Sequence, residues 1–437
     1  MFQSKRFAAP PPRRPLTGAI PDLTADVPVG PGGSGGPGVS RRARTWPLLG
    51  PAFVTAVAYV DPGNFATNIA AGSGYGYLLV WVVVVSNVMA MLIQYLSAKA
   101  GVATGMSLPA LCRAHLPRPV VRGLWGQAEL VAIATDLAEV VGGALALKLL
   151  FDLPLLAGGA ITAAVAFALL GLKGRDHRHF ETVITGLLGV ILVGFVYDVA
   201  VSGVDSVAVL DGTLPRFADA DSVMLAAGML GATVMPHAIY LHSALTSERL
   251  RPRSDAERRT VMRSQRVDVV GAMTVAGLMN LSLLLVAAAA LSGQGIDTIE
   301  GAHAGLGASL GQASALLFAL GLLASGFASS SVGTLSGQVI MEGFVRRRVP
   351  LAARRLVTLL PAVVVLAIGV DPTQALVASQ VVLSFGIPFA LVPLVWFTAR
   401  RDVMGTLVNR KVTTGAGVLV AAAIVVLNVV LLVQLAA

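Results

Sequence analysis

Long apolar stretches dominate this sequence and limit what it can fold into. From about residue 46 onward, eleven segments of roughly 20 predominantly apolar residues follow one another, and a helix needs about 20 such residues to cross a bilayer. The chain is 55% hydrophobic and only 13% charged, against roughly 25% charged in an average soluble domain, which argues against a soluble multidomain enzyme. A β-barrel would need short alternating strands instead. The pattern predicts an all-α polytopic membrane protein with eleven transmembrane helices.

The eleven stretches and the segments between them predict the domain organisation. The expected helices are Trp46–Gly72, Tyr77–Ala100, Gly126–Leu150, Pro154–Leu172, Phe180–Val201, Ser222–Leu245, Val267–Leu291, Ala313–Met341, Leu351–Val370, Thr373–Thr398 and Thr414–Leu435. Residues 1–45 are rich in proline, glycine and arginine, which predicts a disordered cytoplasmic tail. We expect a first repeat of five helices over residues 46–203, a second over 222–398, and an eleventh helix within 411–437.

The positive charges alternate in their placement along the chain. Of the 32 lysines and arginines, 30 fall in the tail and in every second connection, whereas the other connections are mainly acidic. By the positive-inside rule the amino terminus is cytoplasmic, and with eleven helices the carboxyl terminus is extracellular or periplasmic. The net charge of +9 is therefore a topology signal of a multi-pass cell (inner) membrane protein and needs no nucleic-acid partner. The single cysteine, Cys112, excludes an intramolecular disulfide and a cysteine-based metal cluster.

Two of the eleven stretches are interrupted near their middles by proline. The first reads Asp61-Pro62-Gly63-Asn64 and the sixth reads Met235-Pro236-His237. Proline removes a backbone donor and clashes with the preceding turn, so each site should unwind or kink its helix. Because the breaks lie five helices apart, they predict inverted-topology repeats with a binding site at mid-membrane depth.

The groups at the two breaks form a set of metal-ligand types. Asp61 brings a carboxylate, Asn64 an amide oxygen and Met235 a thioether, and unwinding should free carbonyls such as those of Ala58 and Ala232. A thioether does little for Mg²⁺ or Ca²⁺ but tolerates Mn²⁺, Fe²⁺, Co²⁺ or Cd²⁺, so the set predicts a transition-metal site. The alternative interpretation is that Met235 is ordinary packing and Asp61 caps a half-helix.

Three further ionisable residues are expected at membrane depth. His237 follows the second break, and Asp136 and Glu139 lie three residues apart on one face of the third helix. Charged side chains within membrane helices are costly and usually functional, and chains of acids and histidines form proton relays. We therefore predict a proton pathway through Asp61, His237, Asp136 and Glu139. A static buried ion pair that holds the helices together is the alternative.

Other polar residues allow two interpretations. Gln380 in the tenth helix and Asn280 in the seventh could be further or state-dependent ligands, although interhelical hydrogen bonding is the more common use of such residues. Arg354 and Arg355, at a helix end, could pair with the buried acids, but we interpret them first as topology signals.

The two break motifs and the segment from Asp136 to Glu139 together resemble the natural resistance-associated macrophage protein (NRAMP) family, whose bacterial members are proton-coupled manganese transporters. The resemblance covers nearly the whole chain from about Trp46. It implies a LeuT-like fold of two inverted five-helix repeats plus one extra helix. It also implies that Asp61, Asn64, Met235 and the carbonyls of Ala58 or Ala232 bind metal, that Gln380 joins in one state of the cycle, and that His237, Asp136 and Glu139 conduct protons toward the cytoplasm.

One segment departs from that family's pattern near the eighth helix. Its small-residue spacing from Gly326 to Gln338 survives, while Phe327 and Leu335 stand where a polar and an aromatic residue are typical. We expect this change to concern gating more than substrate class. Family relatives that carry magnesium or aluminium would lack the methionine, and Met235 is present.

The resulting expectation is a symporter, not an enzyme, that imports Mn²⁺ and Fe²⁺, with Cd²⁺ and Co²⁺ as further candidates, together with protons. It needs no cofactor, its partners are these ions and the lipid bilayer, and a monomer would suffice. A sodium-coupled organic-solute transporter, a passive metal channel and an intramembrane hydrolase are the alternatives. The acid at the first break argues against an anionic solute, and the sequence lacks a His-Glu-x-x-His motif and a convincing serine nucleophile for a hydrolase.

Overall fold

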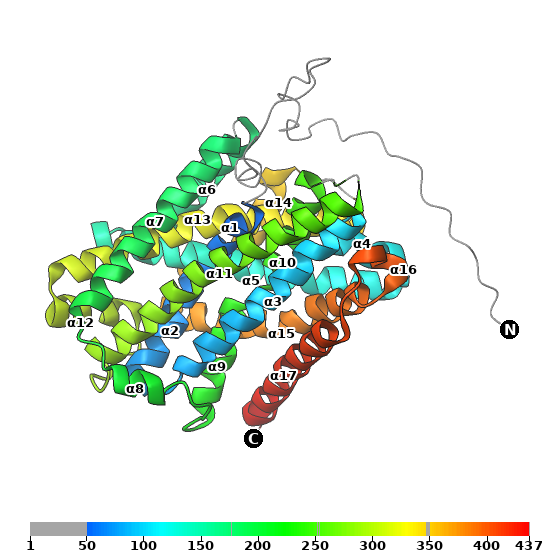
Figure 1. Ribbon diagram of the computed structural model, residues 1–437. Coiled ribbons are helices and arrows are strands. Elements are labelled where there is room, and N and C mark those ends of the chain that lie inside the picture. The colour runs from blue at the N-terminus through cyan, green and yellow to red at the C-terminus, as the bar shows by residue number, and fades with distance from the viewer. Residues whose placement is uncertain (1–49, 176, 251, 253, 347–349, 437) are drawn as a thin grey trace, which may run out of the picture. The chain divides into compact units, whose positions relative to one another are not determined.

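The computed structural model describes residues 50–175, 177–250, 252, 254–346 and 350–436, so the tail predicted for residues 1–45 lies outside the described residues. Every regular element of the described residues is a helix, which agrees with the predicted all-α class (Figure 1). The elements are α1 Pro51–Ala56, the 3-10 helix η3 Val57–Val60, α2 Pro62–Tyr75, α3 Val80–Thr104, α4 Leu108–His115, α5 Arg118–Phe151, α6 Leu155–Arg175, α7 His177–Val201, α8 Ser206–Asp211, α9 Ala220–Thr233, α10 Pro236–Arg249, α11 Asp255–Ala290, α12 Ile299–Leu310, α13 Gln312–Val345, α14 Leu351–Ile368, α15 Pro372–Thr398, α16 Arg401–Met404, the 3-10 helix η4 Gly405–Leu407 and α17 Lys411–Ala436.

The described parts of the eleven apolar stretches fall on these helices. Eight helical segments of the described residues are long and apolar enough to cross a membrane. The other three stretches correspond to α6, α14 and the interrupted series α1, η3 and α2. The multi-pass membrane architecture is therefore confirmed, while the count of eleven spans and the repeat boundaries stay predictions.

The structure adds four short helices that the apolar pattern did not predict. These are α4, α8, α12 and α16, in connections between the long helices. The prediction relied on apolar stretches of membrane-span length, so it did not include short helices or helices with polar residues. The third predicted helix was also drawn too short, since α5 begins at Arg118 rather than Gly126, with a proline in its first turn, where proline is well tolerated.

Both proline motifs interrupt their helices as predicted. The 3-10 turn η3 ends at Val60, Asp61 is extended with φ −85° and ψ 169°, and α2 begins at Pro62. In the second motif α9 ends at Thr233, Met235 is extended with φ −77° and ψ 121°, and α10 begins at Pro236. In a continuous helix the amides of residues 62 and 236 would bond the carbonyls of Ala58 and Ala232, and proline has no such amide.

Helix α5 packs against α13 and α15, and α13 also packs against α7 and α10. Small residues permit the close approach of α13 to α5, because a Cβ on Gly326 would lie 3.1 Å from the Cα of Gly143. Gly333 similarly leaves room for the Glu139 carboxylate, from which a Cβ would be 2.8 Å away. The small-residue spacing noted in this segment is therefore a packing requirement of α13.

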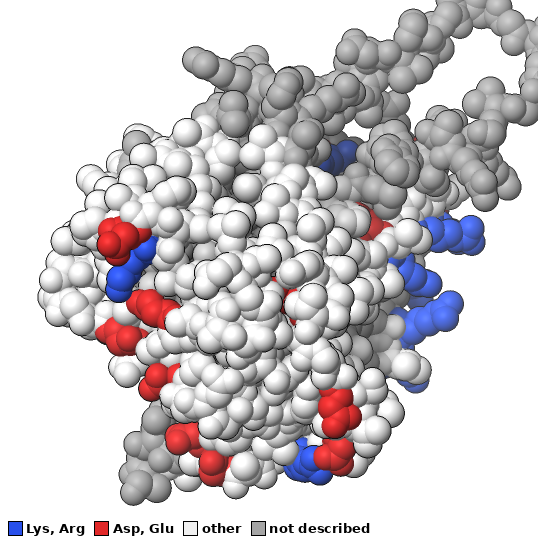
Figure 2. Space-filling view, turned by 90° about the vertical axis from the view of Figure 1, so that its left-hand side faces the viewer, with Lys and Arg blue, Asp and Glu red and all other residues white. Residues whose placement is uncertain are grey.

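The charges of the described residues divide between the two ends of the helices. Short helices α8 and α12 lie toward one end and α4 and α16 toward the other (Figure 1). In Figure 2 acidic side chains gather toward one side of the visible face and basic ones mainly toward the other, with uncharged surface between them. This separation agrees with the alternation of charge along the sequence, and we call the two sides the acidic end and the basic end.

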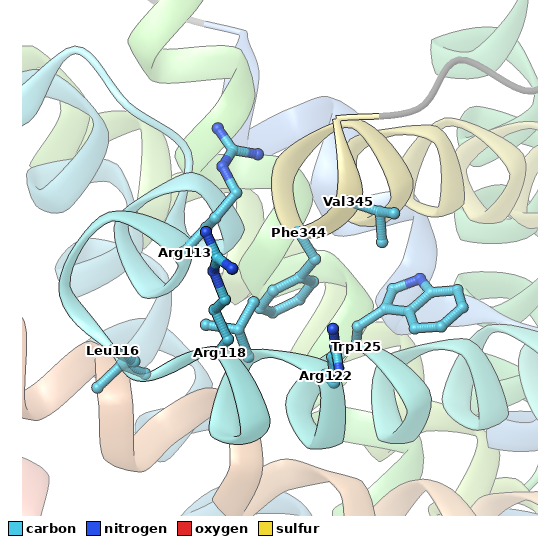
Figure 3. A pocket seen from close by; sticks show the side chains of 8 residues that line it. Arg113, Leu116, Arg118, Arg122, Trp125, Phe344 and Val345 are labelled. Atoms are coloured by element: carbon cyan, nitrogen blue, oxygen red, sulfur yellow. The ribbon is translucent and has the colours of Figure 1, made fainter.

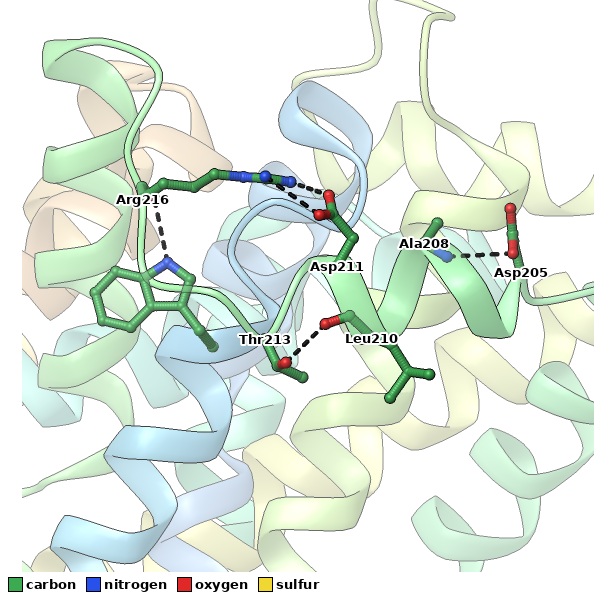
Figure 4. Close-up of polar contacts among 7 residues, drawn as sticks. Asp205, Ala208, Leu210, Asp211, Thr213 and Arg216 are labelled. Atoms are coloured by element: carbon green, nitrogen blue, oxygen red, sulfur yellow. Dashed lines mark hydrogen bonds and ion pairs between the residues drawn. The ribbon is translucent and has the colours of Figure 1, made fainter.

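At the acidic end, the connection between α7 and α9 is held by local hydrogen bonds (Figure 4). Asp205 caps α8 by accepting from the amide of Ala208 at 3.2 Å, and Asp211 pairs with Arg216. The indole of Trp81 donates to the carbonyl of Arg216 at 3.1 Å. The loop that joins the two predicted repeats is thereby attached to the start of α3.

Candidate metal site

The first helix break places Asp61 at the amino-terminal end of α2. Its Oδ1 accepts from the backbone amide of Asn64 at 2.8 Å and from Asn64 Nδ2 at 2.8 Å. Both side chains are buried, with 1% and 0% exposure. Asp61 therefore caps its half-helix, which was the alternative interpretation to metal binding. Its carboxylate also contacts the side chain of Asn64.

The second break meets the first through Asn64. Its Nδ2 also donates to the carbonyl of Ala232 at 3.1 Å, the carbonyl that would bond the amide of residue 236 if that residue were not proline. A third helix joins them, because Gln380 Nε2 of α15 lies 3.4 Å from Asp61 Oδ2. The structure thus brings Asp61, Asn64, Ala232 and Gln380 together from three parts of the chain.

Met235 and Ala58 complete the set of candidates. Met235 is the extended residue that precedes Pro236, and its side chain is fully buried. Ala58 lies in η3, one turn before Asp61, and is 1% exposed. The residues predicted as ligands therefore lie at the two breaks and on the facing helix α15, and their ligand role stays a prediction.

Two amide oxygens at these breaks have no partner among the described residues. They are Asn64 Oδ1 and Gln380 Oε1, and both are buried. A buried acceptor without a hydrogen bond is costly, and a cation supplies what such an oxygen lacks. Three or more His, Cys, Asp or Glu side chains nowhere cluster as a metal site in the part of the chain that the structure describes, so one carboxylate with amide, carbonyl and thioether groups is the available donor set.

Neighbouring helices donate hydrogen bonds to two further backbone carbonyls near the first break. Asn280 of α11 donates to the carbonyl of Tyr59 at 2.8 Å, and Ser325 of α13 donates to that of Val60 at 2.6 Å. Asn280 therefore makes the interhelical hydrogen bond that we considered the more common use of such a residue. Ser325 was missed, because a serine within a helix of many small residues carries no distinctive sequence signal.

The predicted proton pathway is partly assembled. His237 Nδ1 lies 3.2 Å from Thr135 Oγ1, so α10 contacts α5 one residue before Asp136. Asp136 and Glu139 lie three residues apart on α5. Both acids are buried, and neither His237 Nε2 nor Glu139 Oε2 has a hydrogen-bond partner among the described residues.

The two arginines of α14 are buried and make specific contacts, and their role as topology signals stays a prediction. Arg354 forms an ion pair of 2.8 Å with Glu129, an acid on α5 that the sequence analysis missed. Arg355 is 1% exposed and donates to the carbonyl of Ser330 at 3.1 Å and to the Thr334 hydroxyl. Glu129 precedes Asp136 by seven residues, two helical turns, so helical periodicity was the signal that could have found it.

An all-helical membrane protein with two proline breaks that meet around buried polar groups belongs to the class of secondary transporters with broken helices. The chain belongs to the natural resistance-associated macrophage protein-like family, whose family model matches residues 52–434. This agrees with the resemblance found in its sequence motifs.

Several relatives are divalent metal cation transporters named MntH. The protein from Bacillus subtilis is 52% identical over 391 residues, which cover 89% of this chain and 92% of the relative. The protein from Deinococcus radiodurans is 49% identical over 399 residues and 91% of each chain.

Solved structures agree with the family assignment. A manganese transporter from Eremococcus coleocola, solved with an aromatic bis-isothiourea substituted compound, matches with a TM-score of 0.82 and 32% identity over 94% of this chain and 90% of that one. The nucleobase-cation-symport-1 family transporter Mhp1 matches with a TM-score of 0.60 at 16% identity, over 89% of this chain and 93% of that one. The fold is therefore LeuT-like.

Proposed function

We propose that this chain is a symporter that imports divalent transition metals, Mn²⁺ and Fe²⁺ first and Cd²⁺ and Co²⁺ as further substrates, together with protons. The observation that carries the proposal is the convergence of Asp61, Asn64, Ala232 and Gln380 at two helix breaks. The curated relatives carry the name divalent metal cation transporter, which supports the same class of substrate. On this proposal the chain transports ions and catalyses no chemical reaction.

The donor set favours a borderline transition metal. The Asp61 carboxylate offsets part of the cost of removing water from a divalent ion, and the Asn64 and Gln380 oxygens add neutral donors without further charge. Binding requires the Asn64 amide to turn its oxygen toward the ion in place of the Nδ2 that now donates to Asp61 and Ala232. The Met235 sulfur then discriminates against Mg²⁺ and Ca²⁺, which prefer oxygen and water.

Proton coupling follows from the neighbours of Asp61. A protonated Asp61 is a poor metal ligand, so metal binding favours loss of its proton, and a nearby acceptor allows that proton to move on. Glu139 and Asp136 are both buried and lie three residues apart on α5, while His237 contacts Thr135 beside Asp136. This arrangement supports a route from Asp61 through His237 or the two acids.

Alternating access is supported by the division between broken and continuous helices. The half-helices of the two breaks pack on one another through α2 and α9, while the continuous helices α5 and α13 pack together along their lengths. We propose that the broken helices move relative to α5 and α13 and expose the site to one side of the membrane at a time. The amino terminus is proposed to be cytoplasmic and the carboxyl terminus extracellular or periplasmic, as the positive-inside rule predicts.

Proteoliposomes that contain a pH-sensitive dye and a metal indicator test the proposal. Mn²⁺ should enter saturably and acidify the interior, and Asp61→Ala should abolish both signals. The matched control is Asp198→Ala, which removes another buried carboxylate, on α7. Mn²⁺ entry without acidification would point to a passive channel. If a folded parent protein carries no Mn²⁺, the organic-solute transporter becomes the better explanation.

A further inference from the structure

A hollow at the basic end lies outside the candidate metal site and has no role in the proposed transport. It has a volume of about 410 Å³ and is lined by Arg113, Leu116, Arg118, Val121, Arg122, Trp125, Phe344 and Val345. This volume falls within the range of about 300–1,000 Å³ that is typical of small-molecule sites. Figure 3 shows Arg118 and Arg122 on α5 beside the Phe344 and Trp125 rings, with Arg113 extending from α4 away from the rings in this view.

The lining has a positive part and an apolar part. Arg118 and Arg122 lie one turn apart on α5 and are exposed, and Arg113 approaches from α4. Arg113 also donates to the backbone carbonyl of Glu342 at 3.0 Å at the end of α13. Among the described residues that line the hollow, none is acidic, so the arginine charges favour an anion.

Glu129, a partly buried acid on α5, does not cancel this charge. Glu129 accepts from the Trp125 indole at 3.1 Å and pairs with Arg354 at 2.8 Å, so its charge is already balanced by another arginine. The first of these hydrogen bonds also holds the indole at the wall of the hollow. The exposed Arg118 and Arg122 supply the positive charge that attracts a ligand.

The position of the hollow identifies the kind of anion. Arg118 is the first residue of α5, and Phe344 and Val345 are the last two of α13, and both helices are candidate membrane spans. The hollow therefore lies just beyond the predicted spans Gly126–Leu150 and Ala313–Met341, at the ends of the helices that carry them. A free anion such as phosphate would need the arginines but not the five apolar or aromatic side chains. A phospholipid needs both, because its phosphate pairs with arginine and its glycerol and upper acyl chain contact apolar surface.

We propose that this hollow binds an anionic phospholipid, with the lipid phosphate held by Arg118 and Arg122 and the glycerol backbone against Trp125 and Phe344. Arg113 contributes positive charge from α4 while it holds the end of α13. The bound lipid would join α4, α5 and α13 at the basic end. This site is independent of whether the metal site works as proposed.

Native mass spectrometry of the full chain, titrated with phosphatidylglycerol or phosphatidylcholine, tests the proposal. The parent should bind phosphatidylglycerol on the order of tenfold more tightly than phosphatidylcholine, since each basic residue near anionic lipid contributes a severalfold preference. The double variant Arg118→Gln/Arg122→Gln should lose this preference. Arg118→Lys/Arg122→Lys should keep a large part of the preference for phosphatidylglycerol. If the glutamine variant fails to fold, this lysine variant still tests whether positive charge at these two positions is needed.

The matched control is Arg401→Gln/Arg410→Gln, which removes the same charge from exposed residues at the basic end and should retain the preference. If the control lost the preference for phosphatidylglycerol equally, the preference would depend only on the total positive charge, and the proposal would be overturned. Absence of a preference in the parent, or its survival in Arg118→Gln/Arg122→Gln, would do the same. Displacement of the lipid by millimolar inorganic phosphate would assign the arginines to a free anion instead.

Discussion

At the scale of single residues, the sulfur of Met235 is the donor that distinguishes this site from one built of oxygen alone. We expect Met235→Ala to reduce the preference for Mn²⁺ and Cd²⁺ over Ca²⁺ on the order of tenfold, which corresponds to about 1.4 kcal/mol. Competition of each cation against Mn²⁺ uptake measures this preference. Met279→Ala is the control, because Met279 is also fully buried. Both variants should lose stability through the cavity they create, but only the first should admit Ca²⁺. A Met235→Ala protein that excludes Ca²⁺ as well as the parent would contradict the role of the sulfur.

Gly63 is a second residue whose size matters at the candidate site. A Cβ at this position would overlap the side-chain amide of Gln380, so Gly63→Ala should push that amide away from Asp61. We expect Mn²⁺ uptake to fall at least severalfold, with a smaller effect on the melting temperature. Gly74→Ala is the matched control, because Gly74 lies on the same helix and a Cβ there meets nothing within 4 Å. If both variants transport like the parent, the position of Gln380 is unimportant for uptake.

At the scale of elements, helix α1 is held by a side chain from another helix. Asp268 of α11 accepts from the backbone amides of Gly50 at 3.1 Å and Ala52 at 3.0 Å, and it is 1% exposed. Its carboxylate therefore supplies the amino-terminal cap that α1 lacks locally. The cap therefore ties the start of the first broken helix to α11.

We expect Asp268→Ala to destabilise the fold by roughly 1–3 kcal/mol, since it leaves two backbone donors without their acceptor. Thermal unfolding in detergent measures this loss. Asp255→Ala on the same helix is the control, because the pair of Asp255 with Arg258 is solvent-exposed, with a contact of 3.5 Å, and such pairs contribute little. Equal melting temperatures for the two variants would show that the cap contributes no more than a surface ion pair.

A comparison of the helices with the sequence shows which structural features could be predicted from it. The spans and both breaks could be predicted, because apolar length and proline act locally on the backbone. The convergence of Asp61, Asn64 and Ala232 followed from the spacing of the breaks. The pairing of Arg355 with Ser330 and Thr334 could not be predicted, because it depends on how α13 and α14 meet. It gives a physical reason for hydroxyl residues in the segment that departs from the family pattern.

At the scale of the whole molecule, the proposed transport requires a metal route and a proton route that share Asp61. The proposed metal site lies at Asp61 between the broken helices, while the candidate proton acceptors Asp136 and Glu139 lie on the continuous helix α5 and His237 lies on α10. Thr135 contacts His237 across these two parts, and Glu139 packs against the small residues of α13. The metal ligands and the proton acceptors can therefore be altered separately, which makes their coupling measurable.

Asp136→Asn should lower proton flux by much more than it lowers metal affinity. The amide keeps the size of the side chain but cannot take up a proton, and Asp136 is not among the groups that meet at the two breaks. Mn²⁺ binding by calorimetry and internal acidification in proteoliposomes measure the two quantities on the same preparation. Asp198→Asn, at another buried carboxylate, on α7, is the control and should leave both close to the parent values. Loss of binding and flux in equal proportion would instead assign Asp136 to the static packing of α5, because a structural acid supports the metal site and the proton route alike.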